Sequence, residues 1–379
     1  MLSARRRITH RICPSGIILI LYSLPVFDCV SPKKREMKNH LFSQNPPGLN
    51  FVAIGGGNGL STLLSGLKKF VAAGDTESIW LKNLSAIVAV SDNGGSSGRL
   101  RDELQMPPPG DIRNCMVALS EDSHLLSKLF RHRFGGGGDL GGHSFGNLFL
   151  AAMSEITGDF AEAVKLSSEI LASKGHIYPA TLVDVQLKAE LSDGSIVFGE
   201  TNISKVGSSI KRLRLVPENC HPLPEALTAI SEADVITIGP GSLFTSLLPP
   251  ILVKGVTRAI AESSAAKIFI SNLMTQPGET NGFSAKKHLE IIREYAPEID
   301  FDFVIVNNRP ISPAQTEIYA LEGAEQIGVR NSISPDTIEG AEIVCGNLLD
   351  DGEKVRHHSE KLAQVVLLRV LQQSRKLPV

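Results

Sequence analysis

A short apolar segment that ends in a glycine-rich turn and continues at helical spacing is the most constraining pattern in this 379-residue chain. The pattern occurs at Phe51–Ile54, at Ala86–Val90 and at Val235–Ile238. Each apolar segment is of strand length and rich in β-branched residues, and the glycines allow a tight turn into a helix. Repeated strand, turn and helix units form parallel sheets covered by helices. We therefore predict an α/β fold with a mostly parallel sheet.

Two further buried strands are expected at Lys267–Ile270 and Phe303–Val306. Between the second and third of the first three apolar segments, polar and apolar residues alternate over Leu182–Ala189, as in a half-buried strand. A hairpin turn then leads into Ile196–Phe198. We expect a small antiparallel insert near residues 181–216. Helices are expected at residues 60–71, 111–119, 125–134, 145–156, 160–172 and 361–373.

Charge is unevenly distributed along the chain. The whole chain has 38 basic and 40 acidic residues, which argues against a generic nucleic-acid binder. Residues 1–50 alone contain eight basic and two acidic residues, and two of the five cysteines, Cys13 and Cys29. Five cysteines in a chain of this size do not indicate a disulfide framework. The segment before the first strand is therefore different in kind from the rest.

Residues 1–50 are interpreted as an N-terminal extension, and residues 51–379 as one nucleotide-binding domain. The basic residues Arg5–Arg11 followed by the apolar Ile17–Tyr22 suit a targeting segment, but the apolar part is too short to span a bilayer. The alternative is that translation starts at Met37. We expect a cytoplasmic protein without a stable membrane span.

The first candidate site is the turn of Gly55, Gly56, Gly57, Asn58 and Gly59. A turn from a strand to a helix N-terminus exposes backbone N–H groups that bind phosphate. The turn does not match the dinucleotide fingerprint, because the third glycine would fall on Leu60. Nor does it match a Walker A loop, because no lysine follows the glycines. A ligand-free tight turn is the alternative.

Two other turns offer similar groups. The turn after the second strand contains a carboxylate, hydroxyl and amide donors and a guanidinium; its candidate residues are Asp92, Asn93, Gly94, Gly95, Ser96, Ser97 and Arg99. Asp92 is placed to meet a ribose or a metal ion, and a turn or cap role is its alternative. The turn after Val235–Ile238 contributes Gly239, Gly241 and Ser242.

Three further segments carry polar groups. Asp111 is most simply the N-cap of a helix. His143 is a candidate general acid or base, with helix capping as the alternative, and Asn147 could read the edge of a ring. His357 and His358 are interpreted as a solvated helix start. Since polar loops at the carboxyl ends of parallel strands meet at one edge, we expect one shared site, which also includes the loop Met274–Thr280.

The ordered motifs are specific enough to indicate a family. The chain resembles the bacterial gluconeogenesis factor family, which is related to archaeal 2-phospho-L-lactate transferase. The motifs that carry this resemblance are GGGNGLS at residue 55, SDNGGSSGRLR at 91, PPPGDIRN at 107, GGHSFGN at 141, GPGSLFTS at 239 and MTQPGET at 274.

The resemblance implies an α/β fold with a doubly wound, mostly parallel, Rossmann-like sheet and a nucleotide-type ligand at the strand ends. It also implies roles for individual residues. Asp92 falls on the carboxylate-bearing motif and Asn147 on the motif that faces an acceptor, while Tyr319 and Arg356 fall on a C-terminal nucleotide-contact pattern. The chain departs from the family pattern at Asn58, where threonine is usual, and at Phe244, where tyrosine is common.

Three functions are weighed. The resemblance implies first a UDP-sugar-binding factor that supports cell shape and growth on gluconeogenic carbon sources. The second is a magnesium-dependent transferase of a phospholactate type with a diphosphonucleotide donor. The third is an NAD-dependent oxidoreductase, which would bind a dinucleotide; against it, Asp92 follows Gly55 by 37 residues where about 20 are expected. The expected partner is a small nucleotide ligand, and a homo-oligomer is left open.

Overall fold

The computed structural model describes residues 48–71, 81–121, 124–206, 209–328 and 337–374. Every described residue belongs to one compact unit, Phe42–Val379. The two interpretations of the N-terminal extension, as a targeting segment or as sequence upstream of a start at Met37, therefore concern residues outside the described ranges. Among the described residues, no single helix is long and apolar enough to span a membrane.

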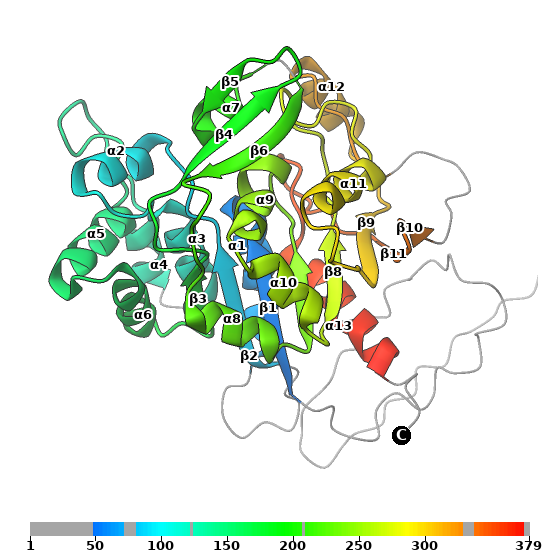
Figure 1. The fold of residues 1–379 in the computed structure, drawn as a ribbon, viewed down its shortest axis with the longest axis horizontal. Coiled ribbons are helices and arrows are strands. Elements are labelled where there is room, and N and C mark those ends of the chain that lie inside the picture. Colours follow the sequence, from blue (N-terminus) through cyan, green and yellow to red (C-terminus); the bar gives the residue numbers. More distant parts are fainter. Residues whose placement is uncertain (1–47, 72–80, 122–123, 207–208, 329–336, 375–379) are drawn as a thin grey trace, which may run out of the picture. The chain divides into compact units, whose positions relative to one another are not determined.

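The main sheet contains eight strands in the order β10-β11-β9-β8-β7-β1-β2-β3 (Figure 1). All neighbouring strands are parallel except β10 and β11. The bounds are β1 Leu49–Gly55, β2 Leu81–Val88, β3 His176–Pro179, β7 Val235–Ile238, β8 Ala266–Ile270, β9 Phe303–Asn307, β10 Thr337–Ile338 and β11 Ala341–Gly346. The predicted α/β fold with a doubly wound, mostly parallel sheet is confirmed.

The strand order reverses at the centre of this sheet. From β1 the chain continues to β2 and β3 on one side, and it later returns to β7 on the other side before adding β8 and β9. The order β3-β2-β1-β7-β8-β9 is that of dinucleotide-binding domains, in which ligands bind at the carboxyl ends of the strands beside the reversal. The turns after β1 and β7 therefore flank the expected ligand position.

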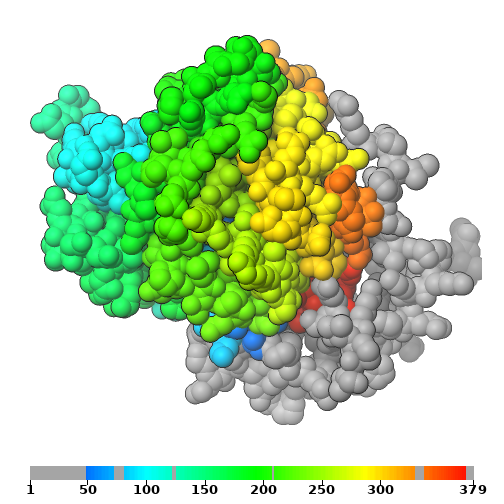
Figure 2. All heavy atoms as spheres, in the orientation of Figure 1, coloured from blue at the N-terminus to red at the C-terminus, as the bar shows by residue number. Residues whose placement is uncertain are grey.

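Helices cover the sheet and bury its strands. Every residue of β7 and β9 is buried, as are five consecutive residues of β1, Phe51–Gly55. In Figure 2 the blue residues of β1 are visible only at the lower rim of this face. The helices of eight or more residues are α1 Gly57–Leu67, α2 Gly95–Leu104, α3 Gly110–Leu119, α4 His124–Arg131, α5 Phe145–Thr157, α6 Phe160–Ile170, α8 Pro224–Ser231, α11 Ala285–Tyr295, α12 Pro313–Leu321 and α13 Ser359–Ser374.

A separate three-stranded antiparallel sheet forms the insert, green in Figure 1. It consists of β4 Gln186–Leu191, β5 Ile196–Phe198 and β6 Ile210–Val216, in the order β5-β4-β6. The short helix α7 Glu200–Ile203 follows β5. One face of this sheet is apolar and buried, because Leu187 and Ala189 of β4 lie beside Leu213 and Leu215 of β6. The predicted antiparallel insert is thus confirmed.

Several predicted bounds were wrong. The alternating segment that starts at Leu182 becomes a strand only at Gln186, because the Thr181 hydroxyl accepts the N–H of Val183 and Asp184 forms an ion pair with Arg101. These polar contacts fix residues 181–184 as a loop. The sequence also gave no prediction of β6. The second strand of the main sheet ends at Val88 rather than Val90.

Candidate functional site

Two helix N-termini lie at the strand reversal, and both lack a side-chain cap. Helix α1 starts at Gly57 after the N-cap Gly56, and α2 starts at Gly95 after the N-cap Gly94. The first N–H groups of a helix have no acceptor within the helix. Because β1 and β2 are adjacent and parallel, the two helix starts lie at the same edge of the sheet. This edge therefore presents an array of backbone donors, together with the exposed side chain of Asn58.

Asp111 occupies one of these donors, and its predicted role as an N-cap was wrong. The N-cap of α3 is Pro109, and Asp111 lies in the first turn. Its Oδ2 instead accepts a hydrogen bond of 2.7 Å from the N–H of Gly57. Burial raises the pKa of Asp111 to about 6, and the nearby Asp92 carboxylate adds to this rise, while the Gly57 hydrogen bond opposes it. A carboxylate of the chain itself thus lies in the first glycine turn.

The turn after β2 is tied to the insert. Asp92 Oδ1 accepts the N–H of Gly94 at 2.7 Å, which fixes the carboxylate at the start of α2. Asn93 Oδ1 accepts the N–H of Thr201 at 3.0 Å, so this predicted ligand contact serves to hold α7 in place. Gly95 faces open space, since a Cβ at this position would meet no other atom within 4 Å. The donors of this turn are therefore accessible at Gly95.

The turn after β7 is held by its neighbours. Gly241 donates its N–H to Asn272 Oδ1 at 3.1 Å, and Ser242 Oγ donates to Glu279 Oε2 at 2.7 Å. Gly59 lies against the backbone of Pro240, where a Cβ would overlap the carbonyl oxygen. Gly59 thus packs the turn of β1 against that of β7, whereas Gly241 and Ser242 tie the turn of β7 to the loop after β8. These contacts use groups that the sequence assigned to ligand binding.

Phe244, one of the two departures from the family pattern, follows this turn in the π-helical segment η3, Leu243–Leu247. Its side chain is buried in the core. Gly239, the first residue of the turn, has a φ of +94° and approaches the backbone of Ile270 closely. A side chain at Gly239 would be strained in this conformation and would meet that backbone, so this glycine is required by the turn itself.

Two further carboxyl groups complete the edge: Glu279 lies in the loop Met274–Thr280 that the sequence assigned to the site, whereas Glu200 was missed. Glu279 is buried and accepts hydrogen bonds from Ser242 and, at 2.8 Å, from Ser204 of the insert. Burial raises the pKa of Glu200, the first residue of α7, to about 9, and Asp92, Asp111 and Glu279 add to the rise. The sequence contains no signal for Glu200, because only the folded insert brings α7 to the edge of the main sheet.

A buried polar cluster lies beside α2. Ser96 Oγ bonds to His143 Nδ1 at 3.0 Å and accepts a hydrogen bond of 3.1 Å from the side-chain amide of Asn147. The N-cap of α5 is Ser144, so the alternative role of His143 as the cap is wrong. Burial and the positive charge of Arg99 lower the pKa of His143, which favours its neutral form. Arg99 donates to the carbonyl of Gly141 at 2.7 Å and so holds the loop before His143.

The C-terminal candidates also meet. Tyr319 Oη accepts the N–H of Val355 at 3.0 Å, which places the exposed Arg356 beside the phenol. His357 is not solvated as predicted: its Nε2 is buried without a hydrogen-bond partner among the described residues. Burial lowers the pKa of His357 to about 4, and a hydrogen bond with the backbone of Ser271 opposes this shift. Ser271 directly follows β8, so this segment lies at the same sheet edge.

Residues 51–349 match the family model of 2-phospho-L-lactate transferase CofD. The chain belongs to this family. The resemblance inferred from the ordered motifs is thereby confirmed. The matched range contains the turns after β1, β2 and β7 and the polar cluster at Ser96, but not Arg356.

Relatives within this family are named gluconeogenesis factors. A protein of Halalkalibacterium halodurans with this name is 45% identical, over 84% of this chain and 95% of its own length. A gluconeogenesis factor of Bacillus subtilis is 42% identical, over 83% of this chain and 96% of its own. A crystal structure of a UPF0052 family member from Bacillus halodurans is 44% identical, with a TM-score of 0.77 over 84% of this chain and 99% of that one.

Proposed function

We propose that the protein binds a nucleotide diphosphate sugar of the UDP-sugar class, with the diphosphate at the first turns of α1 and α2. The observation that carries this proposal is the pair of helix N-termini without side-chain caps, which start from adjacent strands at the reversal of the strand order. Phosphates favour such termini because the N–H groups and the helix dipole both attract negative charge.

Other groups at this edge suit the rest of such a ligand. The side chain of Asn58 is exposed in the first turn of α1, and Arg356 is exposed beside Tyr319. A guanidinium can bind phosphate oxygens in a bidentate manner, and an amide can bind sugar hydroxyls. The relatives named gluconeogenesis factors support a role linked to gluconeogenesis. We further propose that this role concerns growth and cell shape on gluconeogenic carbon sources.

Isothermal titration calorimetry with UDP-N-acetylglucosamine and UDP-glucose tests this proposal. Asn58→Asp adds a negative charge at the first turn of α1, and we expect it to weaken binding at least tenfold, about 1.4 kcal/mol. Asn219→Asp is the matched control, because Asn219 is also exposed but accepts a hydrogen bond from Lys254. Absence of binding at millimolar ligand, or equal affinity of the two variants, would contradict the proposal.

A magnesium-dependent transferase is the second candidate, and the carboxyl groups favour it. No group of three or more histidine, cysteine or acidic residues among the described ones is placed to hold a metal ion. Mg²⁺, however, commonly binds one or two carboxylates together with substrate phosphates. The Asp92 carboxylate adds to the rise in the pKa of Asp111, so a cation bound between the two carboxyl groups would relieve their repulsion. Mg²⁺ there would neutralise phosphate charge during transfer.

In this reading Asp92 and Asp111 would hold the ion, and the N–H groups of α1 and α2 would orient the diphosphate. Release of a nucleoside monophosphate from a panel of diphosphonucleotide donors, with Mg²⁺ present, tests it. Binding without release supports the first proposal over the second. Neither the name of the matching family nor that of the reported relatives concerns an oxidoreductase, so the NAD-dependent reaction gains no support.

A further inference from the structure

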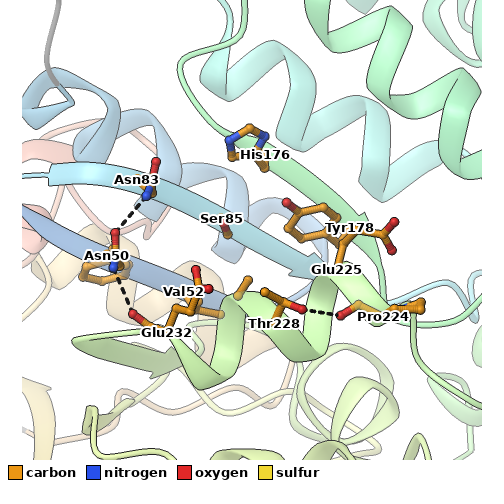
Figure 3. A pocket seen from close by; sticks show the side chains of 12 residues that line it. Asn50, Val52, Asn83, Ser85, His176, Tyr178, Pro224, Glu225, Thr228 and Glu232 are labelled. Atoms are coloured by element: carbon orange, nitrogen blue, oxygen red, sulfur yellow. Dashed lines mark hydrogen bonds between the residues drawn. The ribbon is translucent and has the colours of Figure 1, made fainter.

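A groove lies at the opposite end of the sheet from the glycine turns, beside the amino-terminal parts of the strands. Figure 3 shows the side chains that line it. Its volume is about 350 Å³, and it is bounded by one face of β1, β2 and β3 and by α8. The strands contribute residues of their amino-terminal parts, and α8 contributes one side of the helix. The polar lining residues are Asn50, Asn83, Ser85, His176, Tyr178, Glu225, Thr228 and Glu232.

The floor of the groove is polar, and one of its groups has no partner. Asn83 donates to Asn50 Oδ1 at 2.8 Å, and Asn50 donates to the carbonyl of Glu232 at 2.9 Å. Ser85 is only 5% exposed and lines the groove, and none of the side-chain hydrogen bonds between described residues involves its hydroxyl. A hydroxyl that lines the groove without a protein partner can donate to or accept from a ligand that enters it.

The groove carries negative charge. Glu225 and Glu232 lie seven residues apart on α8 and its C-cap, a rise of roughly 10 Å along the helix. Neither carboxylate forms an ion pair with a described residue. Asp234, just outside the groove, accepts the N–H of Asn50 at 2.7 Å and adds a further negative charge. Among the described lining residues, only His176 can become positive.

One wall is aromatic. The rings of His176 and Tyr178 are nearly parallel, at 11°, with their centroids 6.1 Å apart. Burial raises the pKa of Tyr178, and the negative charge of Glu225 adds to this, which shows that phenol and carboxylate are close. An aromatic face beside a carboxylate attracts cations, and the buried Val52 gives the groove an apolar strip.

We propose that this groove binds a linear polyamine. One terminal ammonium group contacts Glu225 and Tyr178, the other contacts Glu232, and the hydrocarbon chain between them crosses Val52. An inner amine donates to Ser85. A nucleotide does not suit the groove, because the two carboxylates repel phosphate. A divalent metal ion does not suit it either, because carboxylates two helical turns apart cannot share one ion.

Calorimetry of the full chain with spermidine at low ionic strength tests the proposal, with butylamine as the matched monoamine. We expect saturable 1:1 binding of spermidine that is at least tenfold tighter than that of butylamine and that weakens in 150 mM salt. Glu225→Gln and Glu232→Gln should each weaken binding roughly threefold or more, and the double variant about tenfold. Glu169→Gln, an exposed change on α6, is the control and should have no effect.

Ser85→Ala, which keeps the charge of the groove, should weaken spermidine binding about threefold while circular dichroism shows an intact fold. Binding that is equal in the double variant and in the wild type, or that butylamine matches, would overturn the proposal. Titration of UDP-sugar into the same samples distinguishes a failure of this proposal from a failure of the proposed UDP-sugar site. Every groove variant should retain the wild-type UDP-sugar affinity.

Discussion

The carboxylate of Asp111 accepts the N–H of Gly57 at 2.7 Å, so a negative charge of the chain lies in the turn that is suited to bind phosphate. The two residues are 54 positions apart and come from the starts of α3 and α1. A ligand phosphate that binds this turn meets the repulsion of Asp111 unless a cation or a proton neutralises the carboxyl group.

Asp111→Asn removes this charge. We expect UDP-sugar affinity measured by calorimetry in the presence of a chelator to rise roughly fivefold, because phosphate repulsion falls. Addition of Mg²⁺ should strengthen binding to the wild type but have less effect on the variant. Asp102→Asn, an exposed change on α2, is the control. An Asp111→Asn protein that binds more weakly in the chelator would show that the carboxylate helps to build the site.

Gly59→Ala places a methyl group against the carbonyl of Pro240. The turns of β1 and β7 must then move apart, and we expect the free energy of unfolding to fall by roughly 2–3 kcal/mol, with loss of UDP-sugar binding. Gly135→Ala is the matched control, because a Cβ at Gly135 would meet no atom within 4 Å. Urea unfolding of both variants is the measurement, and equal midpoints would contradict the close packing of the two turns.

Ser96→Ala leaves His143 Nδ1 and the Asn147 amide without their shared partner. Removing one partner of buried polar groups costs about 2 kcal/mol, and we expect a loss of that size in urea unfolding. Ser167→Ala provides the comparison, since the buried Ser167 hydroxyl has no hydrogen-bond partner among the described residues. That variant should be as stable as the wild type or slightly more stable; an equal loss in both would refute the assigned role of Ser96.

His357 should make stability fall in acid. Its pKa is about 4 in the folded protein and about 6.5 in an unfolded chain, so the unfolded state binds more protons between these values. The contribution of neutral His357 to the free energy of unfolding is therefore fully present above about pH 6.5. It is lost as the pH falls towards 4, by at most about 3 kcal/mol. His357→Gln should reduce this acid loss, measured as urea midpoints at pH 7 and 4.5. His221→Gln, an exposed control, should keep it.

Glu200 should have the opposite effect. Its folded pKa of about 9 lies above the unfolded value of about 4.5, so its contribution is fully present below about pH 4.5 and is lost as the pH rises towards 9. Glu200→Gln removes that loss, and we expect it to stabilise the protein by about 1–3 kcal/mol at pH 8 and by almost nothing at pH 4.5. A stabilisation that is independent of pH would show that folding does not raise the pKa of Glu200.

The sequence by itself determined the parallel sheet and the position of its main turns. Strand β7 has the predicted bounds, Val235–Ile238, because a buried parallel strand requires a continuous apolar run that ends where the glycine turn begins. The same argument located the donors after β1 and β2, and the ordered motifs indicated the family that the comparison confirmed.

Only the tertiary structure decided which groups share the site. Asp111 reads as a helix cap in sequence, yet its carboxylate bonds to Gly57 of a different helix. Glu200 gave no local signal, because its place at the site depends on the antiparallel insert meeting the main sheet. The loop of Glu279 was predicted, but its hydrogen bond with Ser204 of the insert was not. Hydrophobic periodicity records which face of an element is buried, whereas hydrogen bonds and charge interactions between distant segments depend on distances that only the folded chain defines.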